Sequence, residues 1–165
     1  MNNLKTNLLR RLILQLLLSI GMLVCKVSFA ACPNSKVLTE GFYRQDYSFA
    51  FKDPSNLYTP FTDNFKSLLV AEFKCKSKGD SCRIDWDPWT DAQDGDIVGQ
   101  PIIKLISENE TDASVRVFLK FKFDPLKKPR SISAIVLLKR SNKESCWKID
   151  DFETPSHRPL VKYLQ

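Results

Sequence analysis

The segment that most constrains the fold is residues 113–123, where apolar and polar side chains alternate. Its apolar positions include Val115, Val117, Leu119, Phe121 and Phe123, and the basic residues between them are Arg116, Lys120 and Lys122. Period two is the spacing of a β-strand that buries one face and exposes the other. Such a strand needs neighbouring strands and a layer that covers its apolar face.

Three other segments, 97–106, 131–139 and 146–152, also favour β-strands. Short polar connections separate the strands, and these connections are 108–112, 124–130 and 141–144. Because connections this short join antiparallel neighbours, the sequence predicts an antiparallel meander.

Two segments that precede the strands have helical spacing instead. The first is 35–51, which Gly41 weakens and Asp53-Pro54 ends. Its recurring apolar residues are Leu38, Phe42, Tyr43 and Tyr47. The second can be capped by Thr59 or Thr62. Its apolar face consists of Phe61, Phe65, Leu68, Leu69 and Phe73. Helices first and strands afterwards predict an α+β domain.

Residues 1–30 have the organisation of a secretory signal peptide. Basic residues precede an apolar run over 12–24, and Ser28 and Ala30 have the spacing that signal peptidase prefers, so we expect cleavage after Ala30. Two alternatives stay open. A retained membrane helix would need roughly 20 apolar residues, and lipidation at Cys25 would need a small residue just before it. The signal predicts a periplasmic or secreted protein with no membrane contact after signal removal.

Most of the net positive charge belongs to this predicted signal. The chain has 25 basic and 19 acidic residues, and residues 1–30 hold four basic and no acidic ones, which leaves 21 against 19 in residues 31–165. Since so small an excess is not typical of nucleic-acid binding, we expect no nucleic-acid partner. The basic clusters at 127–130 and 139–140 flank predicted strands and are typical of solvated turns.

Residues 31–165 suffice for a single domain, and the prolines after Thr154 predict a partly mobile tail from about residue 155. Four cysteines lie in this part of the chain: Cys32, Cys75, Cys82 and Cys146. An even number in an oxidising destination predicts two disulfides.

The sequence does not determine the pairing of these cysteines. We favour Cys75 with Cys82, because a short local loop closes easily, and Cys32 with Cys146, which would tie the amino end to the last strand. A zinc site is the alternative, but no second close cysteine pair exists and the only histidine, His157, lies in the tail. We therefore expect no metal and no cofactor.

Residues 84–96, called the aspartate loop below, contain five aspartates and two tryptophans. Three interpretations stay open. Clustered carboxylates suit calcium, but the ligand order of an EF-hand is absent. An aspartate whose pKa is raised beside Trp86 or Trp89 would suit acid–base catalysis. The interpretation we favour is structural: the aspartates accept backbone hydrogen bonds and the tryptophans fill the edge of the core.

Four features together carry a resemblance to a known family. They are Phe42-Tyr43 with Tyr47, Leu68-Leu69, Asp85-x-Asp87-Pro88 with Gln93-Asp94, and Cys146-Trp147-Lys148-Ile149-Asp150-Asp151-Phe152. With these features the chain resembles domain-of-unknown-function family 3828, whose members are secreted bacterial domains. The resemblance implies a nuclear-transport-factor-2-like, or cystatin-like, fold with N-terminal helices in the concave face of a curved antiparallel sheet. It implies no catalytic role.

Residues 31–165 lack a Ser-His-Asp set and a glycine-rich phosphate loop. We therefore predict a non-enzymatic exported binding or protein-interaction domain with a protein or small-molecule partner. Two alternatives stay open: an immunity-type protein that neutralises a toxin, and a small enzyme that uses Asp and Tyr side chains between helices and sheet. The candidate pocket residues are Tyr43, Tyr47, Asp85, Trp86, Asp87, Gln93 and Asp94.

We expect no free thiol in the protein purified from an oxidising compartment, because an even set of cysteines follows residue 30. Titration of the denatured protein with a thiol reagent measures this. Two or more thiols per chain would contradict the disulfide framework and would favour the zinc site.

Overall fold

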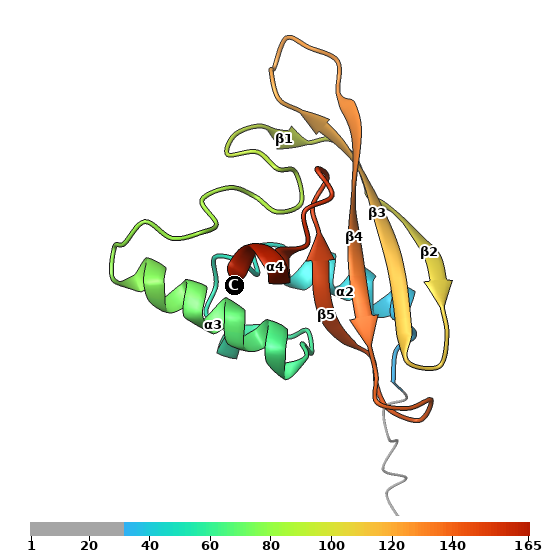
Figure 1. Cartoon of the computed structure of the whole chain (residues 1–165). Helices are drawn as coiled ribbons and strands as arrows, with labels where there is room; N and C mark the ends of the chain where they lie inside the picture. The colour runs from blue at the N-terminus through green and yellow to red at the C-terminus, as the bar shows by residue number, and fades with distance from the viewer. Residues whose placement is uncertain (1–31) are drawn as a thin grey trace, which may run out of the picture. The chain divides into compact units, whose positions relative to one another are not determined.

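The computed structural model describes residues 32–165, and in this part of the chain helices come first and strands follow (Figure 1). The predicted α+β class is confirmed. The predicted signal peptide, residues 1–30, lies outside the described residues. Between residues 32 and 165 no helix is both long enough and apolar enough to cross a membrane.

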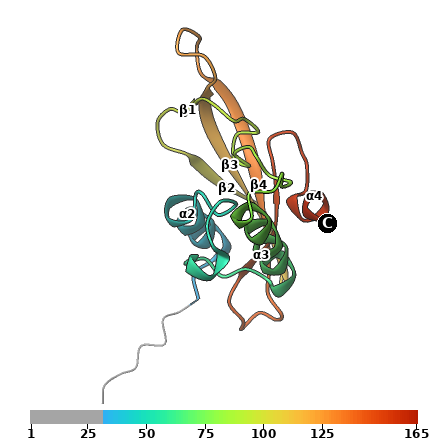
Figure 2. The same ribbon diagram turned by 90° about the vertical axis from the view of Figure 1, so that its left-hand side faces the viewer.

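Strand β3 (Asp112–Lys122) is the centre of the sheet. Strand β4 (Arg130–Lys139) pairs with one of its edges, and β5 (Lys148–Glu153) follows on β4. The other edge of β3 is shared by β1 (Asp96–Ile97) and β2 (Ile102–Glu108). Every pairing between these strands is antiparallel, so the predicted meander is confirmed. The sheet is strongly curled, and Figures 1 and 2 show the helices on one side of it.

The alternation in β3 sets which face of the sheet is buried. The buried side chains of the two central strands are Ala113, Val115, Val117, Leu119, Phe121, Ala134, Val136 and Leu138. Phe123 continues the alternation in the sequence, but it lies beyond the end of β3 and is 70 % exposed. Its predicted place on the apolar face is therefore wrong, because the hairpin turn begins there.

Helix α2 (Ser35–Gln45) begins where the Asn34 side chain accepts a hydrogen bond from the Val37 amide, at 2.9 Å. The prediction that it extends to residue 51 is wrong. It ends at Asp46, whose buried carboxylate accepts hydrogen bonds from the amides of Tyr58 and Thr59 and so holds a distant loop. Helix α3 (Asp63–Ser77) begins at Thr62, one of the two predicted caps.

The predicted strand 97–106 is interrupted. Residue pairing with β3 ends at Ile97, with a last backbone hydrogen bond from the Val98 amide to the Lys120 carbonyl at 2.7 Å, and it resumes at Ile102. The prediction of a single continuous strand is therefore wrong. Gly99 has φ +77°, a left-handed conformation that breaks the extended chain, and Pro101 has no amide for the ladder. The edge strand is therefore split by a loop that covers residues 98–101.

Both predicted disulfide pairings are confirmed. Cys75 and Cys82 close a local loop at the end of α3, with Cα atoms 5.9 Å apart, and Cys32 and Cys146 join the amino end to the connection before β5, with Cα atoms 5.1 Å apart. In the chain-entropy account the long link contributes about 5 kcal/mol and the short one about 2.5 kcal/mol to the free energy of unfolding.

The tail, for which the sequence predicts partial mobility, folds back against β5 and α3. Its short helix α4 (Leu160–Leu164) was not predicted, and it buries Leu160 and Leu164 completely or almost so. The Asp151 carboxylate accepts a hydrogen bond from the Val161 amide at 2.8 Å, which anchors the start of this helix.

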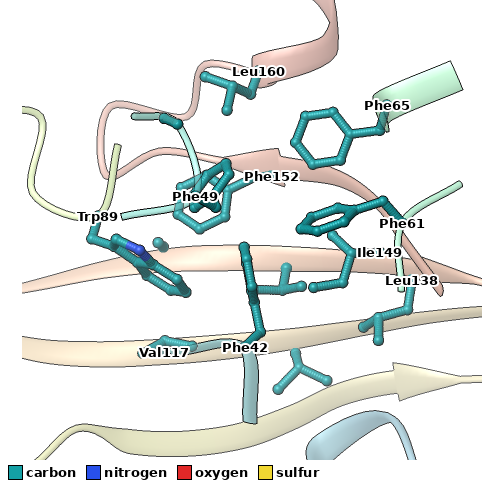
Figure 3. Packing of buried hydrophobic residues seen from close by; sticks show 14 of the residues in the cluster. Phe42, Phe49, Phe61, Phe65, Trp89, Val117, Leu138, Ile149, Phe152 and Leu160 are labelled. Carbon is teal, nitrogen blue, oxygen red and sulfur yellow. The ribbon is translucent and has the colours of Figure 1, made fainter. Parts of the chain in front are cut away.

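The core between helices and sheet is rich in aromatic side chains, and Figure 3 shows them packed against the apolar residues of the strands. Trp89 of the aspartate loop is the largest of the fully buried side chains. The aromatic rings around it are Phe42, Tyr43, Tyr47, Phe49 and Phe152, with centroids 4.7–6.3 Å from the Trp89 ring. The prediction that tryptophans of this loop fill the core is confirmed for Trp89.

Replacing Gly95 by alanine should lower the free energy of unfolding by about 2 kcal/mol or more. The reason is that φ is +122° there, and an added Cβ would clash with Cζ of Phe121 and lie 2.9 Å from the carbonyl oxygen of Lys122. Gly99→Ala is the matched control, since its φ is also positive but no atom lies within 4 Å of the added Cβ. Urea unfolding of both variants measures the difference, and equal losses would show that the contact with Phe121 is unimportant.

Candidate functional site

Asp87 organises the aspartate loop. Its Oδ1 accepts a hydrogen bond from the Trp89 amide at 2.9 Å, and its Oδ2 accepts from the hydroxyls of Tyr47 and Thr90, the latter at 3.2 Å. Its backbone pairs with Ala92 across the same turn. The prediction that Asp87 accepts an amide proton of the turn that follows it is confirmed.

Tyr43 and Tyr47 lie beside this turn. Tyr43 is in α2, whereas Tyr47 lies beyond the end of that helix, so the prediction that one helix over 35–51 carries both is wrong. Their rings nonetheless meet edge to face, with centroids 5.5 Å apart, and the Tyr47 carbonyl accepts a hydrogen bond from Nε1 of Trp89 at 2.8 Å. The core tryptophan thus holds the backbone that presents Tyr47.

Both tyrosines are kept protonated. Partial burial raises the pKa of Tyr43, and the nearby negative charge of Asp87 raises this pKa further. Burial raises the pKa of Tyr47 strongly, and its hydrogen bond to Asp87 raises it further, because ionisation would remove the donated proton. Within residues 32–165 the Tyr43 hydroxyl has no hydrogen-bond partner, so this group is free to donate to a ligand.

The two tyrosines and Asp87 line an open groove of about 390 Å³, called the tyrosine groove below. The loop that splits the edge strand forms its other wall. The lining residues are Tyr43, Tyr47, Asp87, Thr90, Gly95, Asp96, Ile97, Gly99, Gln100, Pro101 and Phe121. Its charged lining residues are both aspartates, and one of them, Asp96, is exposed. The groove therefore favours a neutral or positively charged ligand.

The other predicted pocket residues lie elsewhere. Asp85 and Gln93 are exposed and hydrogen-bonded to each other at 3.2 Å. Trp86 is buried under the tail, where its ring lies 4.6 Å from the Arg158 guanidinium. None of these residues lines the tyrosine groove.

The predicted role of Asp94 as an acceptor for amides of the turn is wrong. Asp94 is exposed, and its side chain makes no hydrogen bond to any residue from 32 to 165. The chain swings into β1 through Gly95, whose positive φ makes the turn without help from a carboxylate.

Three acidic residues that were not among the candidate pocket residues hold this region together. Asp91, which adopts φ +55°, accepts from Arg158 at 2.9 Å and from the Ser156 amide at 2.6 Å. Glu72 is buried in α3 and accepts from the Ile84 amide at 2.8 Å. Asp151, described above at the start of α4, is the third, and burial raises its pKa. Their partners are distant in the sequence, so no local pattern signals them.

Within residues 32–165 no three His, Cys, Asp or Glu side chains are close enough to hold a metal ion together. The aspartate loop spreads its carboxylates over separate partners, as the contacts of Asp87, Asp91 and Asp85 show. Comparison of the chain with known protein families, with characterised proteins and with solved structures finds no match.

Asp87→Ala should lower the free energy of unfolding by about 1–3 kcal/mol, because the Trp89 amide and the Tyr47 and Thr90 hydroxyls lose their acceptor. Asp94→Ala is the matched control, and its free energy of unfolding should be unchanged. Thermal and urea unfolding measure both. An Asp87→Ala variant as stable as the wild type would contradict the structural role of this carboxylate.

Proposed function

We propose that the protein is an exported, non-enzymatic binding domain that holds a small organic cation in the tyrosine groove. The observation that carries the proposal is the composition of the groove, which combines two tyrosine rings with two aspartates and has no basic side chain in its lining. Aromatic faces and carboxylates attract an ammonium group, and they repel an anion.

The roles of the groove residues differ. Tyr43 lines the groove and offers a free hydroxyl, whereas Tyr47 is stacked on Trp89 with an interplanar angle of 16° and donates its proton to Asp87. Asp96 is exposed at the mouth of the groove and supplies a carboxylate that the fold does not use. Asp96 and Tyr43 are therefore the residues that meet the ligand.

A non-enzymatic role is supported by the hydrogen bonds of Asp87. A general base needs a lone pair that is free to take a proton from substrate. Both oxygens of Asp87 already accept hydrogen bonds from the loop and from Tyr47, which itself stays protonated. Asp87 and Tyr47 are therefore committed to each other and to the loop, and they do not form a free acid–base pair.

Two disulfides fit an extracellular or periplasmic protein. We propose that residues 1–30 direct the chain there as a cleaved signal peptide. We likewise propose membership of domain-of-unknown-function family 3828 and a nuclear-transport-factor-2-like or cystatin-like fold. A strongly curled antiparallel sheet with helices on one side supports the fold part of this proposal.

The wild-type protein should bind small amines such as choline and putrescine and should not bind carboxylates of similar size such as glycolate. Asp96→Asn should weaken amine binding about fivefold, because one carboxylate near an ammonium contributes on the order of 1 kcal/mol, and Tyr43→Phe should weaken binding of amines that carry a hydroxyl. Titrations followed by amide chemical shifts in nuclear magnetic resonance measure these affinities and locate the site.

Asp94→Asn is the matched control, because this exposed carboxylate is two residues away and does not line the groove. Its amine affinity should equal that of the wild type. Equal weakening in Asp94→Asn and Asp96→Asn, or tighter binding of glycolate than of choline, would contradict the proposal.

A further inference from the structure

The β3–β4 hairpin concentrates positive charge at one end of the sheet. Residues 122–130, called the hairpin tip below, hold four basic residues and one acidic residue, a net charge of +3. Residues 31–165 together have only two more basic than acidic residues, so the part outside the tip is net −1. In Figure 1 the tip projects at the end of the sheet opposite the connection between β4 and β5.

The same tip exposes two large apolar side chains. Leu126 is 95 % exposed and Phe123 is 70 % exposed. A single exposed apolar residue is ordinary on a protein surface, but here both lie within one turn and lysines flank them on either side. Apolar side chains flanked by cations match the boundary between lipid head groups and acyl chains.

Two of the three cations at the base of the tip make no ion pair with residues 32–165. A cleft of about 250 Å³ lies at the base of the tip, and its charged lining residues are Asp91, Asp124, Lys127, Lys128 and Arg130. The carboxylate of Asp91 is paired with an arginine of the tail, and that of Asp124 with Lys127 at 3.7 Å. Within residues 32–165, Lys128 and Arg130 make no ion pair. They are therefore available to an external phosphate.

We propose that the hairpin tip docks the protein on an anionic lipid surface. Phe123 and Leu126 enter the interfacial layer, and Lys128 and Arg130 bind lipid phosphates at the cleft. The net charge of the chain does not indicate membrane contact, and the sequence predicts none. The placement of the charge around exposed apolar side chains is what leads to the proposal, which is independent of the ligand of the tyrosine groove.

The test is sedimentation of the purified protein with vesicles made of equal parts phosphatidylcholine and phosphatidylglycerol. The wild type should bind them and should not bind pure phosphatidylcholine. A basic residue near an anionic membrane contributes on the order of 1 kcal/mol to binding, which is about fivefold in the partition coefficient. The triple change Lys127→Gln, Lys128→Gln and Arg130→Gln should therefore weaken binding about a hundredfold. Leu126→Ser should weaken it about tenfold without a change in stability, since this side chain is exposed.

The matched control removes three exposed lysines elsewhere, by Lys52→Gln, Lys66→Gln and Lys143→Gln. This control variant has the same net charge and the same N-terminal sequence as the triple variant of the tip. Its affinity for the vesicles should fall at most severalfold. Three results would each overturn the proposal. They are an equal loss of vesicle binding in the two triple variants, no effect of Leu126→Ser on vesicle binding, and binding to polyglutamate, a mimic of an acidic protein surface, without binding to vesicles.

Discussion

Trp89 is fully buried between helix α2 and strand β5 of the sheet. Its contacts join the aspartate loop to the helical layer. Its ring packs among aromatic rings of both layers, its Nε1 donates to the Tyr47 carbonyl, and its backbone amide donates to Asp87. A buried tryptophan needs a partner for its ring N–H, and here that partner is the segment that presents Tyr47. The same residue thus anchors the loop to the core and fixes the wall of the tyrosine groove.

The regular part of the fold follows from local periodicity. The alternation in 113–123 predicts β3 and its buried face because the period of two in a strand depends only on neighbouring residues. The disulfide between Cys75 and Cys82 follows from their closeness in the sequence. The end of α2 could not be predicted in this way, because Asp46 stops the helix and binds a loop thirteen residues further on. The break before β2 did have a local signal in Gly99 and Pro101.

The candidate site, like the fold, could be predicted from the sequence only in part. The sequence named Tyr43, Tyr47 and Asp87 by residue type, and the structure brings these three together across forty residues of chain. Asp85, Gln93 and Asp94 were named for the same reason, yet they lie outside the groove, since composition cannot tell which side of a loop faces a cavity. Asp96 is also an aspartate, but unlike Asp85 and Asp94 it lines the groove. The reason is that β1 pairs with β3 and turns the chain toward the tyrosines.

The two surfaces of opposite charge are neighbours. Phe121 lines both the tyrosine groove and the cleft at the base of the hairpin tip, and Thr90 does the same from the aspartate loop. The Phe121 ring contacts Phe123 on one side, with centroids 6.3 Å apart, and leaves no room for a side chain at position 95 on the other. A tip held against anionic lipid would therefore bring the groove close to the same surface. Small cations gather near anionic lipid, so the negative groove would face the layer of solution in which its ligand is most concentrated.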